Sequence, residues 1–246
     1  MACREIRTRG ATMIENSGRP HAVDALVFDA YGTLFDVQSV ASTAEALFPG
    51  RGATLAQLWR SKQLEYSWLQ SLMQSRGQPR EDFAAVTAHA LSYAAEALAL
   101  PLPAHARHRM LDAYLDLSPF PDAEPTLAAL APRRRLILSN GTHAMLAPLA
   151  AATGLARHLD AILSVDDAGV YKPSPRVYQL AVDALDCPPV RIGFVSSNSW
   201  DAIGAKAFGF TVFWINRSGA PIDRHGPAPD CMIRSLADLP ALLTAA

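Results

Sequence analysis

The feature that most constrains the fold of this chain is a recurring alternation of short apolar segments with helical patterns. The apolar segments are rich in β-branched residues and have the character of buried strands; they lie at 25–28, 136–138, 161–163, 192–195 and 211–215. Helical patterns separate most of them, over 122–131, 145–153 and 175–185. Ser174 at the N-cap and Pro175 at the first position mark the start of the last helix. This alternation predicts an α/β fold with a doubly wound parallel sheet.

The stretch between Asp36 and Leu117 interrupts the alternation, because it holds helical patterns and no convincing strand. Its clearest helix spans about 54–76, and the Gly-Gln-Pro sequence at 77–79 ends it. The residues that recur along this helix at three- and four-residue spacing are Leu55, Leu58, Trp59, Lys62, Tyr66, Leu69 and Met73. Two more helices are expected over 81–98 and 104–117. We therefore expect an inserted all-helical domain over 38–117, a core domain formed by 22–37 and 118–246, and a disordered tail over 1–21.

The charge balance narrows the class of partner. The 246 residues carry 22 Lys+Arg and 23 Asp+Glu, a net charge of −1, so a small-molecule substrate fits better than nucleic acid or an anionic membrane. Cys3, Cys187 and Cys231 form neither a disulfide framework nor a zinc pattern, which favours the reducing cytoplasm. No apolar run has the length of a membrane span, and residues 1–20 lack the apolar core of a signal peptide.

Polar clusters follow the ends of the expected strands, which is where ligands bind in open parallel sheets. The clusters are Asp-Ala-Tyr-Gly-Thr at 29–33, Ser-Asn-Gly-Thr at 139–142, Val-Tyr-Lys-Pro at 170–173 and Ser-Ser-Asn-Ser-Trp-Asp at 196–201. Each alone has an ordinary explanation: Asp29 as a turn residue, Lys172 as a solvated lysine, Asn198 as a helix cap. Their convergence on one edge of the sheet instead predicts a shared functional site.

At these residues the sequence resembles the haloacid dehalogenase superfamily, over residues 23 to about 243. Asp29 matches the nucleophile of motif I, Ser139 the hydroxyl of motif II, Lys172 the lysine of motif III and Asp201 the last acidic position of motif IV. The resemblance implies a Rossmann-like core, with the helical insertion as the family's cap domain.

At two positions the sequence departs from the phosphatases of this superfamily, and both departures indicate one particular branch of the superfamily. Where phosphatases carry a second Asp as general acid this chain has Tyr31, and where they carry a carboxylate for Mg²⁺ it has Asn198. Neither a metal nor another cofactor is therefore expected. A displaced chloride or bromide leaves without taking up a proton, and no phosphoryl charge needs neutralising. The reaction therefore needs neither the general acid nor the metal ligand that these two positions lack. The stretches 28–36, 59–68 and 196–201 resemble the L-2-haloacid dehalogenases.

This resemblance implies hydrolysis of short-chain L-2-haloalkanoic acids to D-2-hydroxyalkanoic acids and halide. Asp29 would attack the halogenated carbon opposite the halogen, forming a covalent ester and inverting that centre. Arg60, reaching from the cap, would meet the departing halide. Lys172 would keep Asp29 ionised, and would join Asn198 and Asp201 in holding the water that hydrolyses the ester.

The resemblance also assigns supporting residues. The substrate carboxylate would lie against Ser139 and the backbone N–H groups that follow Asp29, beginning at Ala30, with Asn140 close to the halide. Further hydrogen-bond partners are Thr33, Ser196 and Tyr178. An apolar wall that accepts the alkyl group would consist of Tyr31, Leu64 and Trp200, each of which could equally be ordinary core.

Two alternatives remain open at this point. One is a magnesium-dependent small-molecule phosphatase of the same superfamily, against which Tyr31 and Asn198 argue. The other is a binding or scaffold protein that has kept the fold and lost the chemistry, against which the joint presence of Asp29, Arg60 and Lys172 argues. The resemblance further implies a homodimer formed through the cap.

Overall fold

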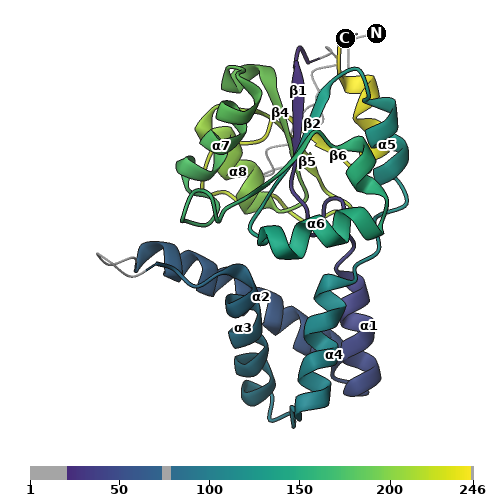
Figure 1. Ribbon diagram of the computed structural model, residues 1–246, viewed down its shortest axis with the longest axis vertical. Helices are drawn as coiled ribbons and strands as arrows, with labels where there is room; N and C mark the ends of the chain where they lie inside the picture. Colours follow the sequence, from purple (N-terminus) through teal and green to yellow (C-terminus); the bar gives the residue numbers. More distant parts are fainter. Residues whose placement is uncertain (1–20, 74–78, 245–246) are drawn as a thin grey trace, which may run out of the picture.

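A six-stranded parallel sheet forms the centre of the core domain, in the order β3-β2-β1-β4-β5-β6 (Figure 1). The computed structural model describes residues 21–73 and 79–244. The strands are β1 (Ala25–Phe28), β2 (Arg134–Ser139), β3 (Ala161–Ser164), β4 (Ile192–Ser196), β5 (Thr211–Ile215) and β6 (Cys231–Ile233). The predicted parallel sheet and its five predicted strands are confirmed. β6 was not predicted, because three residues are too few to form a recognisable pattern.

β1 lies in the middle of the sheet and determines where the polar clusters meet. All four of its residues are buried. Phe28, its last residue, is level with Ile137 of β2 on one side and Val195 of β4 on the other. The strands run parallel, so the chain segments that follow β1, β2 and β4 emerge at the same edge of the sheet.

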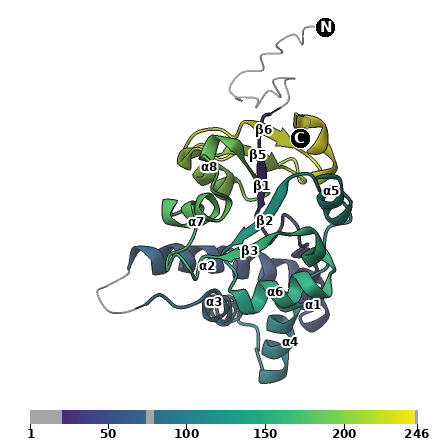
Figure 2. The same ribbon diagram turned by 45° about the horizontal axis from the view of Figure 1, so that its top comes forward.

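Helices cover both faces of the sheet, as Figures 1 and 2 show. α7 (Pro175–Leu185) and α8 (Ser199–Phe208) lie on one side, with α5 (Ala123–Ala129) and α6 (His143–Ala152) on the other. Short 3-10 turns complete the core at Leu155–His158, Pro189–Arg191, Leu236–Asp238 and Pro240–Leu242.

Local sequence sets the ends of these helices. The hydroxyl of Thr142 accepts a hydrogen bond from the backbone N–H of Met145 and so caps α6. α8 ends at Gly209, whose φ of 116° lies in the left-handed region that favours glycine. Ser174 is the N-cap residue of α7, as predicted, but its side chain makes no capping hydrogen bond. Pro175 therefore supplies the start signal of α7.

The inserted domain packs across the sheet edge from which the polar clusters emerge (Figure 1). Its described residues form α1 (Gln38–Leu47), α2 (Gly52–Leu72), α3 (Phe83–Ala97) and α4 (Ala104–Leu115). α1 was not predicted, since small and polar residues dominate it and only Val40 and Ala44 are buried. A side chain at Gly52 would collide with the backbone of Glu45, 2.3 Å away, so this glycine lets α2 begin directly against α1.

The buried face of α2 differs from the expected apolar stripe. Leu55 and Trp59 are buried as expected, but the stripe continues through Gln63 and Ser67, while Leu69 and Met73 are exposed. The expected end of this helix at 77–79 lies partly outside the described residues. Polar groups therefore enter the interior of the cap on the face that turns toward α3 and α4.

Direct contacts join the cap to the core next to the loop that carries Lys172, here called the lysine loop. Arg80 forms an ion pair with Asp166, with 2.7 Å between the charged atoms, and its guanidinium lies 4.1 Å from the ring centroid of Tyr171. The hydroxyl of Tyr171 donates to the backbone carbonyl of Glu81 at 2.7 Å. Tyr171 directly precedes Lys172, so these contacts link the position of the cap to the lysine loop.

The two ends of the described chain meet at the core. His21, which we had assigned to the disordered tail, pairs with Leu243, and its ring contacts Phe213 edge-on. The rest of the expected tail, residues 1–20, lies outside the described residues. Among the helices of the described chain, none is long and apolar enough to cross a membrane.

Candidate active site

The four polar clusters predicted from the sequence meet between the sheet edge and the cap. Asp29 follows β1, Asn140 follows β2 and Asn198 follows β4, while Lys172 lies in the loop that precedes α7. Two hydrogen bonds join the clusters directly. The amide of Asn198 donates to Asp29 at 2.8 Å, and the side-chain oxygen of Asn140 accepts from the backbone N–H of Lys172 at 3.0 Å.

A buried lysine lies between two carboxylates at the centre of the site. The Lys172 ammonium is 3.1 Å from one oxygen of Asp29 and 2.9 Å from an oxygen of Asp201. Burial alone would lower the pKa of Lys172, but the two neighbouring carboxylates raise it above its usual value. Lys172 therefore stays charged at neutral pH and occupies the space between the carboxylates.

Asp201 is fully buried and supports the lysine from behind. One of its carboxylate oxygens accepts from Lys172 and from Ser196, the latter at 3.1 Å. The other accepts from the hydroxyl of Tyr178 at 2.8 Å. Burial raises the pKa of Asp201, and Lys172 opposes that effect. Both oxygens are occupied by protein donors, so the expectation that Asp201 holds a water molecule is not what its geometry favours.

The second oxygen of Asp29 is held by two side chains. Thr33 donates to it at 3.1 Å and Asn198 at 2.8 Å. Thr33 is itself fixed because its hydroxyl accepts from the backbone N–H of Ser197 at 2.9 Å. The turn between Asp29 and Thr33 contains Gly32 at a φ of +86°, a conformation that L side chains rarely adopt. These contacts give the carboxylate one fixed orientation.

A small chamber opens at Asp29 under the cap. Its lining consists of Asp29, Tyr31, Arg60, Leu64, Phe83, Ser139, Asn140, Asn198 and Trp200. The free space is about 10 Å³, close to what one water molecule needs. Of the substrate-contacting residues predicted from sequence, only Ala30 is absent from this lining. Phe83 was missed because it is the first residue of a cap helix and follows no strand.

Ser139 and Tyr31 present hydroxyls at this chamber. Ser139 is buried, and its hydroxyl oxygen accepts from the backbone N–H of Gly141 at 3.2 Å. The Tyr31 hydroxyl is buried and has no hydrogen-bond partner among the described residues. Burial raises the pKa of Tyr31 far above its usual value, so this hydroxyl stays protonated. It is a donor and not a replacement for an acidic carboxyl.

Arg60 reaches the chamber from α2, where the sequence had placed it. Its guanidinium donates to Asn198 at 3.3 Å, and so bridges from the cap to the core. It also donates to Gln63 at 2.8 Å and to Tyr114 at 3.2 Å. Sequence reasoning missed Gln63 and Tyr114. The one available signal was a glutamine on the same helix face as Trp59, where an apolar residue is expected.

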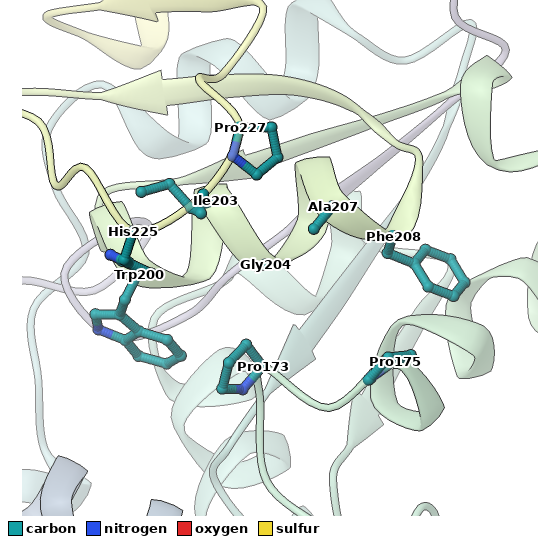
Figure 3. Close-up of a pocket in the computed structure, with 10 residues that line it drawn as sticks. Pro173, Pro175, Trp200, Ile203, Gly204, Ala207, Phe208, His225 and Pro227 are labelled. Carbon is teal, nitrogen blue, oxygen red and sulfur yellow. The ribbon is translucent and has the colours of Figure 1, made fainter.

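Trp200 forms a wall shared by the chamber and an apolar groove on the core surface (Figure 3). The groove has a volume of about 460 Å³ and is lined by Pro173, Pro175, Trp200, Ile203, Gly204, Ala207, Phe208, His225, Gly226 and Pro227. From the cap, Trp68 contacts Trp200 edge-on, with 5.5 Å between ring centroids. Trp200 therefore separates the chamber from the outer groove.

The donor set of the chamber is poorly suited to a divalent metal ion. Mg²⁺ prefers oxygen ligands including carboxylates, but the position between Asp29 and Asp201 is taken by the Lys172 ammonium. Over residues 21–73 and 79–244, no cluster of three or more His, Cys, Asp or Glu side chains forms a metal-binding group. A carboxylate held by a lysine and an amide is instead equipped to act as a nucleophile.

Comparison with known proteins identifies relatives over most of the chain. A family described as haloacid dehalogenase-like hydrolases matches residues 23–209. An (S)-2-haloacid dehalogenase of Xanthobacter autotrophicus is 44% identical over 90% of this chain and 95% of its own length. An (S)-2-haloacid dehalogenase of Pseudomonas sp. (strain YL) is 44% identical over 87% of this chain and 91% of its own.

Solved structures give the same result. The crystal structure of an L-2-haloacid dehalogenase aligns with a TM-score of 0.88 at 44% identity, covering 91% of this chain and all of that one. The structure of the Xanthobacter autotrophicus L-2-haloacid dehalogenase with chloropropionic acid covalently bound aligns with a TM-score of 0.82 at 43% identity, covering 89% of this chain and 98% of that one.

Proposed function

The chain belongs to the haloacid dehalogenase-like hydrolases, and we propose that within this family it is an (S)-2-haloacid dehalogenase. It converts short-chain L-2-haloalkanoic acids to D-2-hydroxyalkanoic acids and halide. One observation carries the proposal: the Asp29 carboxylate borders the chamber between Lys172 and Asn198, with Arg60 on the same chamber wall. The 44% identity to two (S)-2-haloacid dehalogenases supports the choice of substrate.

In the first step Asp29 attacks the halogenated carbon on the side opposite the halogen. A carbon–oxygen bond forms, the carbon–halogen bond breaks with its electron pair on the halide, and the centre inverts. Lys172 and Asn198 fix the direction of the attacking carboxylate. Negative charge moves from Asp29 to the halide, and Arg60 stabilises that charge as it develops.

The substrate carboxylate is anchored on the far side of the chamber from the cap. Ser139 and Asn140 border the chamber there, and the backbone N–H groups from Ala30 onward add donors at the turn after β1. Tyr31, Leu64, Phe83 and Trp200 supply the apolar surface against the alkyl group.

In the second step the oxygen of water bonds to the acyl carbon of the Asp29 ester and the bond from that carbon to the ester oxygen breaks. The ester oxygen takes up a proton from the water and leaves as the hydroxyl of the hydroxy acid, and the Asp29 carboxylate is restored. Asn198 borders the chamber and orients this water. Lys172 remains beside the ester, and Asp201, held by Ser196 and Tyr178, keeps Lys172 in place. We thus assign Asp201 a positioning role rather than the water-binding role expected from sequence.

The reaction as proposed requires no metal and no organic cofactor. Asp29 displaces a halide that leaves without protonation, and the Lys172 ammonium already occupies the position between the two carboxylates. The odd number of cysteines, with no framework pattern, supports an assignment to the cytoplasm.

We further propose that the protein forms a homodimer through its cap. Leu72 and Met73, adjacent at the outer end of α2, expose 82% and 64% of their surface. Apolar side chains grouped in this way are commonly covered by a partner. Analytical ultracentrifugation of the wild type beside a Leu72→Glu, Met73→Glu variant tests this, and a monomeric wild type would reject it.

Halide release from the separate enantiomers of 2-chloropropionate tests the proposed function. We expect release from the L enantiomer with formation of D-lactate, unchanged after exhaustive EDTA treatment. The control is p-nitrophenyl phosphate with Mg²⁺, on which the alternative phosphatase would act. Phosphate release there, without halide release from either enantiomer, would replace the dehalogenase by the phosphatase.

A further inference from the structure

The guanidinium of Arg60 is held by neutral oxygens only. Its contacts are the side-chain oxygens of Gln63 at 2.8 Å, Tyr114 at 3.2 Å and Asn198 at 3.3 Å. Within the described chain, no carboxylate lies at ion-pair distance from Arg60. Partly buried arginines commonly pair with acidic residues, so a support made only of amides and a phenol is a specific feature of this site.

Gln63 is itself fixed in one orientation from the interior of the cap. It is fully buried on α2, and its amide nitrogen donates to the hydroxyl of Thr87 on α3 at 2.7 Å. The hydroxyl of Tyr114 on α4 donates to the Gln63 side-chain oxygen at 3.0 Å. That oxygen therefore receives donors from Arg60 and Tyr114, and three cap helices hold Arg60 through one amide.

The neutrality of Gln63 matters because Arg60 borders the chamber into which the halide departs. A carboxylate in place of the amide would accept the same hydrogen bond from Arg60, but would also offset its positive charge in a poorly solvated site. Stabilisation of a developing anion depends on the net charge and direction of the preorganised donors. A neutral acceptor keeps the geometry and leaves the charge available.

We infer that Gln63 is a positioning residue that aims Arg60 at the departing halide while leaving the charge of Arg60 uncompensated. The inference rests on the proposed dehalogenase function and extends it. It states that Gln63 influences how strongly the rate depends on which halide leaves. Chloride is a poorer leaving group than bromide. The chloride reaction therefore needs the charge of Arg60 more.

Gln63→Glu separates charge from geometry, since it keeps the acceptor oxygen and adds a negative charge. With L-2-chloropropionate we expect kcat to fall by roughly 10²-fold, as on removal of one donor to a developing charge, and the loss with L-2-bromopropionate to be several times smaller. Calorimetric titration of the free protein with bromide should show weaker binding. Gln63→Leu, which frees Arg60 but keeps its charge, should bind bromide better than Gln63→Glu.

Gln70→Leu is the matched control, because Gln70 lies on the same helix and makes two side-chain hydrogen bonds, both to Glu81. It should keep the wild-type ratio of chloride to bromide rates. Thermal unfolding of each variant shows whether it is folded. If Gln63→Glu does not fold, Gln63→Leu takes its place, and we expect it to lower the ratio of the chloride rate to the bromide rate by a smaller factor.

The inference is overturned if Gln63→Glu loses equal activity on both substrates, or none, and binds bromide like the wild type. It is also overturned if Gln63→Leu binds bromide more weakly than Gln63→Glu, because the hydrogen bond alone would then matter. A wild type that releases no halide from any 2-haloacid would instead refute the proposed function, and bromide binding would still decide the role of Gln63.

Discussion

Two negative and two positive side chains make up the charges of the site. Asp29 and Asp201 carry the negative charges, Lys172 lies between them, and Arg60 adds the second positive charge from the cap. When Asp29 becomes an ester its charge passes to the halide, so the total stays constant while negative charge moves from the Lys172 side of the chamber to the Arg60 side. No counterion from solvent is needed, which suits a chamber with space for about one water molecule.

The isotope distribution after one turnover tests Asp29 as nucleophile. With excess enzyme in ¹⁸O-labelled water and limiting L-2-chloropropionate, the new hydroxyl of D-lactate should carry unlabelled oxygen, because it comes from the Asp29 carboxylate. The peptide containing Asp29 should gain one heavy oxygen, measured by mass spectrometry. Label in the lactate hydroxyl would show direct attack by water, with Asp29 as a general base.

The residues proposed to touch the substrate have clearer signals in the sequence than those that hold them in place. Asp29, Lys172 and Asn198 follow strands or stand in recognisable motifs, so their positions in the sequence place them. Gln63 and Tyr114 act through hydrogen bonds between residues 51 positions apart, and no local pattern reveals such a pair. Asp201 was located correctly, but its complete burial and occupied oxygens were visible only in three dimensions.

At the scale of elements, the core supplies Asp29 and the cap supplies Arg60, the residues proposed as the nucleophile and as the donor to the halide. α2 carries Arg60, Leu64 and Trp68 toward the core, and α8 begins beside them with Trp200. Trp200 lines both the chamber and the outer groove of about 460 Å³, and Figure 3 shows the residues of the groove. We expect Trp200 to restrict the alkyl group to the chamber and to keep it out of the groove, which Trp200 also lines.

Trp200→Ala should therefore broaden the range of chain lengths. Each methylene that becomes buried contributes about 0.8 kcal/mol, so four additional methylenes reaching the groove raise the ratio of kcat/KM for L-2-bromoheptanoate over L-2-bromopropionate by up to ~10²-fold. The measurement is the ratio and not the absolute rate, because the loss of one chamber wall also slows turnover of the short substrate.

A second substitution tests whether the longer chain enters the groove. Ala207 lines the groove and not the chamber, so Ala207→Trp alone should leave the L-2-bromopropionate rate unchanged. Added to Trp200→Ala, it fills the groove and should cancel the gain on the longer substrate. A gain that persists in the double variant would place the alkyl chain elsewhere.

The elements themselves were predicted where their sequence patterns were long or strongly apolar. β1 and β5 were predicted with the bounds that the structure has. α1 was missed because its contacts bury only two small or medium side chains, and the buried face of α2 was mistaken in its second half, where Gln63 and Ser67 replace apolar residues. Tertiary contacts within the cap decided both cases.

At the scale of the whole molecule, one carboxylate joins the start of α5 to the C-terminal segment. Asp122 accepts two hydrogen bonds from Arg217, at 2.8 and 2.9 Å, and others from the Ser235 hydroxyl and the backbone N–H of Leu236. Burial would raise the pKa of Asp122, but these donors together lower it below its ordinary value of 3.8. The segment that follows β5 is thereby fastened to the start of α5.

Asp122→Asn should reduce stability in a pH-dependent way. Because the pKa is lower in the folded chain, the stabilisation is fully present above the unfolded value of 3.8 and is lost as the pH falls through the folded value. We expect urea unfolding at pH 7 to show a loss of about 1–3 kcal/mol, and a smaller difference between variant and wild type near pH 3. Asp24→Asn, which breaks an exposed ion pair with Arg191, should change stability little.

The size of the chamber also imposes an order in time. A chamber with space for about one water molecule has to widen to take a haloacid, and we expect it to close again around the ester. We therefore expect the halide to diffuse away before water enters, so that the two products depart in a fixed succession. Rapid mixing of enzyme with L-2-bromopropionate should then show one equivalent of bromide appearing ahead of any D-lactate, and the interval between them is the lifetime of the acylated enzyme.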